Sequence, residues 1–446
     1  MDLVSLPGFR DFFPEEAARR AYIFSKWRDA AERYGFVLYD GPPLETTELY
    51  RRKSGDELIG QLYCFEDKGG REVTLRPEMT PSLARMVASR GTSLPKPIKW
   101  FSIPQLFRYE RQQRGRLREH FQFNCDILGE AGPAADAELV ALLVDCLCSF
   151  GLTEKDIWVR VSDRPLLAAL LEALGIKADG QKAVFQAVDK LTREPTEKIH
   201  ANMVAGGLTA EQATKVLSLF DGRKLMDIAS EFDGSKTVCD RILVLQQFFG
   251  ILDAMGLASY VEFDLGIVRG LAYYTGIVFE VFDRKGEFRA ISGGGRYDNL
   301  LKTIGGFDLP ALGFGMGDVV LGELLTERKL WPAKLMKGLD AYLVLVDEKL
   351  RLPMLALAHQ LRSTGFSVDY GLSETNVGKQ FKAASQKESR FAVVLGPDEW
   401  KRGMVKLKNL MTRDEIEVGV EGIVKRLQES RLSHSTMPEP ISQHRD

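Results

Sequence analysis

Arginine side chains concentrate in one short segment, residues 107–122. One acidic residue, Glu110, stands among the guanidinium groups of Arg108, Arg111, Arg114, Arg116 and Arg118. Apolar runs typical of strands lie on both sides with a glycine between them, which predicts a β-hairpin with a basic tip. Guanidinium forks match phosphate and carboxylate oxygens two at a time, so the hairpin suits a nucleoside triphosphate or an RNA backbone. A solvated charged hairpin is the alternative.

Polar and apolar residues alternate along the second strand of this hairpin. The polar set is Gln122, Asn124 and Asp126, and the apolar set is Phe121, Phe123, Cys125 and Ile127. Successive side chains of a strand point to opposite faces, so the polar groups share one face. This pattern indicates a lined pocket, and an exposed sheet face is the alternative.

Two other segments carry residues suited to binding. A hairpin over residues 63–76 leads to Glu78 and Thr80, at the start of a helix expected from Pro81. Their alternative role is helix capping. Three consecutive glycines, 293–295, lie between a strand and a helix, where they let a ligand approach the backbone closely. The chain contains no GxxxxGK[ST] motif, so any ATP would be bound without a P-loop.

The composition excludes several classes of protein. A length of 446 residues predicts roughly two or three domains. No apolar run approaches the ~20 residues of a membrane span, and the N-terminus lacks the pattern of a signal peptide. The five cysteines are scattered, which favours buried thiols in a reducing cytoplasm over a metal site. Because the net charge is only −2, nucleic-acid binding would depend on local basic patches.

The C-terminal part has a different pattern from the rest. Strands at 340–346, 367–370 and 391–395 alternate with helices at 351–364, 377–386 and 421–428. This alternation predicts a separate α/β domain at 339–430 with a largely parallel sheet, after a linker at 331–338. A basic patch runs from Lys379 to Lys408, and residues 431–446 are expected to be disordered. Farther upstream, residues 176–235 are expected to form an all-helical insertion.

In this order the segments resemble those of the histidyl-tRNA synthetases, a class II aminoacyl-tRNA synthetase family. The opening helix and strand, through Pro42, resemble the dimer-building motif 1, and residues 107–122 resemble motif 2. Residues 269–276 resemble the histidine-specific signature, 293–298 its usual companion, and 339–430 the anticodon-binding domain. The resemblance implies an α+β catalytic domain at 1–330, on an antiparallel sheet flanked by helices.

The resemblance also implies a role for each matching residue. Arg108 and Arg269 would act on the α-phosphate as catalytic residues, with Glu110 at the adenine and Arg116 at the ATP phosphates. Histidine would contact Glu78, Thr80, Arg108, Gln122, Asp126, Tyr273 and Tyr274. The tRNA would contact Gln112, Gln113, Arg114, Lys379, Lys382 and Lys408.

The implied reaction has two steps. The histidine carboxylate attacks the α-phosphate of ATP to give histidyl-adenylate, and the 3′ end of tRNA(His) then takes the histidine. Mg²⁺ would accompany ATP without a dedicated metal site in the protein. A cytoplasmic homodimer is expected.

Three positions depart from the family pattern. Ala272 replaces a frequent Asp, and His120-Phe121-Gln122 replaces Phe-His-Gln. Val320 occupies the position at which motif 3 has an arginine that binds the γ-phosphate. Arg116, Arg118 or Arg296 is the expected substitute.

Two other functions fit part of the sequence. A regulatory subunit of ATP phosphoribosyltransferase shares the catalytic fold without charging tRNA, but it typically lacks the C-terminal domain. A nucleic-acid-binding protein without catalysis would use the basic patch, but it leaves the polar strand face at 122–126 unexplained.

Overall fold

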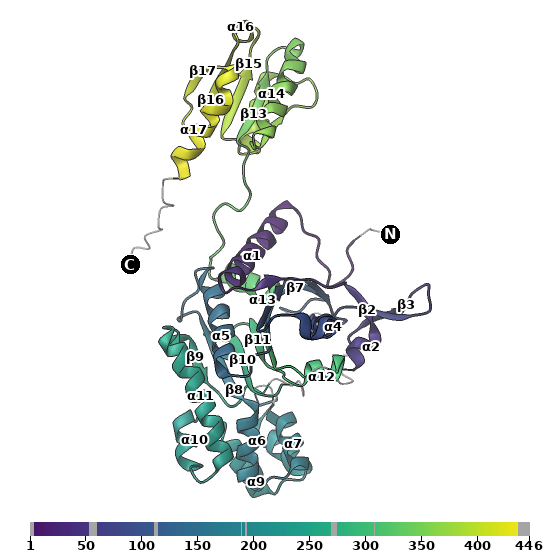
Figure 1. Ribbon diagram of the computed structural model, residues 1–446. Helices are drawn as coiled ribbons and strands as arrows, with labels where there is room; N and C mark the ends of the chain where they lie inside the picture. Colours follow the sequence, from purple (N-terminus) through teal and green to yellow (C-terminus); the bar gives the residue numbers. More distant parts are fainter. Residues whose placement is uncertain are drawn as a thin grey trace. The chain divides into compact units, whose positions relative to one another are not determined.

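The computed structural model describes residues 4–52, 60–110, 115–188, 190–191, 194–268, 274–306 and 308–435. The chain divides into two compact units, Met1–Ala333 and Lys334–Asp446 (Figure 1). Among the described residues, no helix has the length and apolar character that crossing a membrane requires.

A mostly antiparallel sheet forms the centre of the first unit, which confirms the expected fold class. Its strand order is β1-β5-β7-β12-β11-β10-β8-β9, and β6 also pairs with β7. The pairs β1–β5 and β8–β9 are parallel. The strands are β1 (Val37–Leu38), β5 (Ile98–Ser102), β6 (Gln105–Phe107), β7 (Glu119–Leu128), β8 (Ile157–Asp163), β9 (Val261–Phe263), β10 (Ile277–Asp283), β11 (Ser292–Arg296) and β12 (Ala311–Gly317).

A smaller sheet and several helices complete this unit. The small sheet has the order β2-β4-β3. Its strands are β2 (Leu44–Thr46), β3 (Tyr63–Glu66) and β4 (Glu72–Leu75). The helices are α1 (Pro14–Arg33), α2 (Thr47–Arg51), α4 (Thr80–Arg90), α5 (Pro133–Cys148), α12 (Leu300–Gly305) and α13 (Asp318–Glu327).

Among its described residues, the segment expected to be helical contains several helices and no strand. It lies within a longer run of helices that Figure 1 shows gathered at one end of the first unit. The run comprises α6 (Arg164–Ala173), α7 (Ala178–Val188), α8 (Thr196–Ala205), α9 (Ala210–Ser218), α10 (Leu225–Glu231) and α11 (Lys236–Ala254). Asp163 fixes the start of α6, because its side chain accepts a hydrogen bond from Leu166 N at 2.7 Å.

The strand β7 has one face in the hydrophobic core. Phe123 is fully buried, and its ring stacks on that of Trp27 in α1, with centroids 5.5 Å apart and planes 10° apart. Phe101 and Phe314 meet the same ring edge-on from the neighbouring strands. Such aromatic packing adds to the free energy of burial and fixes the orientation of α1 on the sheet. The residues of opposite parity therefore face the other side of the sheet.

The second unit contains a five-stranded sheet of order β14-β13-β15-β16-β17. Its strands are β13 (Ala341–Leu345), β14 (Val368–Tyr370), β15 (Phe391–Leu395), β16 (Met404–Asn409) and β17 (Glu415–Gly419), and its helices are α14 (Arg351–Ser363), α15 (Val377–Gln386), α16 (Pro397–Lys401) and α17 (Ile423–Ser435). The first three strands are parallel, and β16 and β17 add antiparallel pairs that the sequence pattern did not predict.

The end of α17 differs from the sequence prediction. The helix continues to Ser435, so residues 431–435 are helical rather than disordered. The physical reason is an anchor to the sheet: Arg431 pairs with Asp340, with Nε 3.0 Å from Oδ1. Residues 436–446 lie outside the described residues.

Candidate active site

The polar side chains of β7 form a hydrogen-bonded row on the face opposite the aromatic core. His120 Nε2 lies 3.2 Å from Gln122 Oε1, and Gln122 Nε2 donates to Asn124 Oδ1 at 3.1 Å. At the far end of the row, the Tyr297 hydroxyl donates to Asp126. Each side chain is thus oriented by its neighbour before any ligand arrives.

A strip of glycines lies beside this row. In the register of the sheet, Gly313, Gly315 and Gly317 of β12 are opposite Asp126, Asn124 and Gln122. A Cβ at Gly315 would clash with the Gln122 amide, and one at Gly313 would clash with the Asp126 carboxylate. The strip continues onto β11, because Gly293 is opposite Gly315 and Gly295 is opposite Gly313. The glycines are needed to give the polar groups room.

Tyr274 lies at the end of the glycine strip. Its ring carbon Cδ1 is 3.0 Å from the position that a Cβ would take at Gly295. The residue is 6% exposed and belongs to a buried cluster with Tyr297 and Met79. The structure therefore brings Tyr274, Gln122 and Asp126 onto the same face of the sheet.

The segment before α4 lies beside Arg108. Arg108 Nε donates to the carbonyl of Pro77 at 3.0 Å. Phe107 N donates to the carbonyl of Arg76 at 3.0 Å, which aligns the two segments. Glu78 is half-buried just after this contact, and Thr80 is the first residue of α4. Arg108 and the segment of Glu78 and Thr80, all expected to contact histidine, thus lie side by side.

Glu110 and Arg116 form an ion pair across the base of the hairpin. The Glu110 side chain is 7% exposed and that of Arg116 is 43% exposed. Arg118 is held differently: its Nε donates to the Glu110 carbonyl at 3.3 Å, and its guanidinium lies 4.4 Å from the centroid of the Tyr109 ring. Arg116 is therefore the arginine with more freedom to turn towards a ligand.

Several expected contact residues are outside the described residues. They are Arg269, Tyr273, Gln112, Gln113 and Arg114. The expected tRNA contacts of the second unit are described. Lys379 and Lys382 are exposed on α15, and Lys408 on β16 lies 5.6 Å from the centroid of the Phe381 ring.

Arg296 is not available as a phosphate ligand, so this part of the sequence hypothesis is wrong. It is 7% exposed, and its Nη2 lies 2.6 Å from Asp136 Oδ2. Nη1 donates to the carbonyl of Glu130 at 2.8 Å, and Nη2 also reaches the carbonyl of Gly132 at 3.2 Å. Burial raises the pKa of Asp136 to about 6 although the guanidinium opposes this shift. Arg296 joins β11 to the start of α5.

His120 is a site residue that the sequence reasoning missed. Burial lowers its pKa to about 3, and the charge of Arg108 adds to the shift, so the imidazole is neutral at physiological pH. Its position, two residues before Gln122 in the same strand, was the available signal. A neutral ring at the end of the polar row offers both a flat face and a hydrogen-bonding nitrogen to a ligand.

Arg10 is a second residue beside the polar row that the sequence reasoning missed. Its Nε lies 2.6 Å from Glu119 Oε1, and its Nη1 lies 2.9 Å from Asp318 Oδ2. Asp318 in turn accepts a hydrogen bond from Phe121 N at 2.9 Å. This network ties the N-terminal segment, the start of β7 and the first turn of α13 together.

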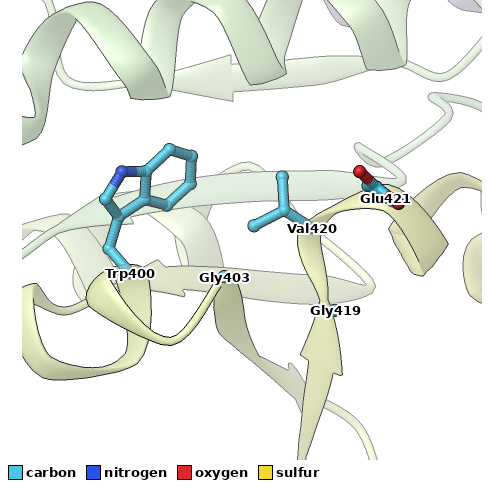
Figure 2. A pocket seen from close by; sticks show the side chains of 5 residues that line it. All are labelled: Trp400, Gly403, Gly419, Val420 and Glu421. Carbon is cyan, nitrogen blue, oxygen red and sulfur yellow. The ribbon is translucent and has the colours of Figure 1, made fainter.

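A cavity of about 460 Å³ lies in the second unit. Its lining includes Trp400, Val420 and Glu421, together with two glycines, 403 and 419 (Figure 2). In Figure 2 the Trp400 and Val420 side chains border the same opening. The cavity contains none of the residues predicted to bind a ligand.

Comparison with known proteins gives a consistent result over nearly the whole chain. A family model described as "Histidyl-tRNA synthetase" matches residues 8–317, and one described as "Anticodon binding domain" matches residues 340–430. A curated "Histidine--tRNA ligase" from Opitutus terrae is 48% identical over 423 residues, which are 94% of this chain and 96% of the relative. A chloroplastic/mitochondrial histidine–tRNA ligase from Arabidopsis thaliana is 41% identical over 411 residues, which are 92% and 84% of the two chains.

Solved structures share the fold. A histidyl-tRNA synthetase from a Nostoc species superposes with a TM-score of 0.79 at 23% identity, covering 96% of this chain and all of that one. The apo enzyme of S. aureus gives a TM-score of 0.72, also at 23% identity, with 96% of this chain and 100% of that chain covered.

The buried ion pair of Arg296 predicts a purely structural phenotype. Arg296→Ala leaves the Asp136 carboxylate buried without its cation, which should cost about 3–5 kcal/mol of unfolding free energy. Arg116→Ala removes a half-exposed ion pair and should cost about 1 kcal/mol or less. Urea unfolding of both variants measures the difference. A wild-type unfolding free energy for Arg296→Ala would contradict the assignment.

The lowered pKa of His120 predicts an acid-sensitive stability. Below about pH 6.5 the unfolded chain protonates this imidazole while the folded protein does not, so stability is lost as pH falls towards 3. The loss is at most about 1.4 kcal/mol per pH unit. His120→Gln removes it, so the melting temperature of the variant should gain on wild type between pH 7.5 and pH 5. His359→Gln, at an exposed position on α14, controls for the substitution itself. A constant difference between His120→Gln and wild type over this range contradicts the account.

Proposed function

The chain belongs to the histidyl-tRNA synthetase family, and we propose that it ligates histidine to tRNA(His) through the site on β7. The reaction activates L-histidine with ATP to histidyl-adenylate and then transfers histidine to the 3′ end of the tRNA. The observation that carries the proposal is the placement of Arg108 beside the segment 77–80, with the polar row of β7 and the glycine strip on the same sheet. This arrangement suits a carboxylate and a phosphate that must react with one another.

Arg108 is the proposed catalytic group of the first step. The histidine carboxylate attacks the α-phosphate, and pyrophosphate leaves. Negative charge gathers on the phosphate oxygens in the transition state, where a fixed guanidinium stabilises it with little reorganisation. Its hydrogen bond to the Pro77 carbonyl holds the side chain in place in the absence of substrate. Arg269 would act on the same phosphate.

Histidine would lie over the glycine strip. We assign its amino group to Asp126, Gln122 and the segment of Glu78 and Thr80, and its ring to Tyr273 and Tyr274. The hydrogen bond from Tyr297 keeps Asp126 oriented for this task. A substrate without ring nitrogens would leave polar groups of the pocket unpaired, which can reduce its use by ~10⁴-fold.

ATP would displace the ion pair at the base of the hairpin. Glu110 would turn to the adenine and Arg116 to the phosphates, which is feasible because the Arg116 side chain is 43% exposed. We propose that Mg²⁺ enters with ATP, held by the phosphate oxygens. The cation would neutralise phosphate charge while the chain's own arginines orient the nucleotide.

The tRNA would contact both units. Gln112, Gln113 and Arg114 would meet the acceptor end, and Lys379, Lys382 and Lys408 would meet the anticodon region. We accordingly assign catalysis to residues 1–330, anticodon binding to 339–430, and a linker to 331–338.

A cytoplasmic homodimer is the proposed form of the enzyme. The edge strand β1 supports this, because Val37 and Leu38 are 62% and 46% exposed there. Exposed apolar residues on an unpaired strand edge favour association. Light scattering measures the mass in solution, and the mass of a single chain would contradict the homodimer.

The ligase function predicts histidine-dependent exchange of pyrophosphate into ATP by the purified chain. Asp126→Asn should lower kcat/KM for histidine by about 100-fold, because a charged partner of the substrate is lost. Asp308→Asn, at an exposed carboxylate of the same unit, should leave the rate unchanged. Absence of exchange in the wild-type chain would instead favour the regulatory paralogue.

The α15 lysines predict a salt-dependent contact with tRNA. The double variant Lys379→Ala/Lys382→Ala should raise KM for tRNA roughly tenfold at physiological salt, with a shallower salt dependence. Pyrophosphate exchange, which needs no tRNA, should be unaffected. Lys425→Ala, at an exposed lysine of the same unit outside the basic patch, is the matched control. Equal KM values for the double variant and this control would refute the contact.

A further inference from the structure

The arginine expected in motif 3 is replaced by a packed apolar side chain. Val320 lies in the first turn of α13 and is 8% exposed. Its Cγ2 is 3.2 Å from the position that a Cβ would take at Gly115, where the hairpin returns towards β7. Val320 therefore supports the hairpin and offers no charge to a ligand.

A different arginine reaches the same place. The Cδ of Arg289 lies 4.0 Å from that same point at Gly115, beside Oε2 of Glu323 in α13, which lies 3.9 Å from it. The side chains of Val320 and Arg289 thus converge on the returning arm of motif 2 from two separate elements. Arg289 is exposed, in the connection between β10 and β11.

The register of the sheet explains why Arg289 is there. Ser292 of β11 is opposite Met316 of β12, in an antiparallel pair. Residues that precede Ser292 therefore run beside those that follow Met316, which form the first turn of α13. Arg289 comes three residues before Ser292 and Val320 comes four residues after Met316, so they lie at the same end of the sheet.

The backbone around Arg289 is fixed on both sides. Asp283 accepts hydrogen bonds from Glu287 N at 3.1 Å and from Phe288 N at 3.0 Å. Ile291 is buried, and its N donates to the Val281 carbonyl at 2.8 Å. The connection is thus held on both sides of Arg289, and the residue itself is exposed to solvent.

We propose that Arg289 binds the terminal phosphates of ATP in place of the motif 3 arginine. The inference rests on the proposed ligase function and adds a residue to it. Arg296 is buried against α5, and Arg118 lies over Tyr109, so neither is placed for this role. Arg289 and Arg116 would bind the polyphosphate from the two sides of the Gly115 turn. A guanidinium suits this role because its donors pair with two phosphate oxygens at once.

The test compares ATP with AMP, which lacks the β- and γ-phosphates. Pyrophosphate exchange gives KM for ATP and, by competition, the inhibition constant of AMP. Arg289→Ala should raise KM for ATP about tenfold or more and leave AMP inhibition unchanged. Arg289→Lys, which keeps the charge, should lose less. Lys285→Ala, at an exposed position of the same connection, should match wild type in both measurements.

The outcomes separate this inference from the proposed function. An inactive wild-type chain would overturn the ligase function itself. An active wild type with an unchanged ratio of ATP to AMP affinity in Arg289→Ala would overturn only the role of Arg289. Normal exchange with slow transfer from preformed histidyl-adenylate to tRNA would assign Arg289 to a tRNA phosphate and would also overturn the proposal.

Discussion

The period-two alternation of β7 is the constraint on which the rest of the structure depends. One parity places Phe123 against Trp27 in the core, and the other parity places Gln122, Asn124 and Asp126 in the candidate site. A shift of one residue in register would bury the polar row and expose the aromatic rings. The packing energy of the core therefore fixes the geometry of the site, because both belong to the same strand.

The glycine strip is the second half of this arrangement. Side chains on β11 and β12 would fill the space that the polar row of β7 occupies, as the clashes at Gly313 and Gly315 indicate. Glycine weakens a strand because it loses more conformational freedom on folding. The buried pair of Arg296 and Asp136 joins β11 to α5 next to the strip. Arg296 thus resembles a phosphate ligand in the sequence, but in the fold it connects β11 to α5.

The sequence predicted what depends on local pattern and on motif order. The antiparallel sheet, the helical segment and the shared face of Gln122 and Asp126 follow from periodicity or from the resemblance to the family. The strand β16 was missed although residues 405–408 alternate apolar and charged side chains with the period of a half-buried strand, because its lysines were assigned to a basic patch. The strand β17, which pairs with it, was missed too.

Contacts between distant segments were beyond the reach of the sequence. The role of Arg296 was wrongly predicted because a buried and an exposed guanidinium look the same in a sequence. Arg289 and Val320 meet through the register of β11 and β12, which no local pattern encodes. Likewise, burial lowers the pKa of His120, and three arginines add to the shift, of which Arg10 and Arg108 are far apart in the sequence.

The most direct measurement of the central claim is a crystal structure with ATP and histidine bound. The account predicts histidine over the glycine strip, with its amino group at Asp126 and its carboxylate facing Arg108. It also predicts the terminal phosphates between Arg116 and Arg289. Ligands bound away from the polar face of β7 would contradict the account.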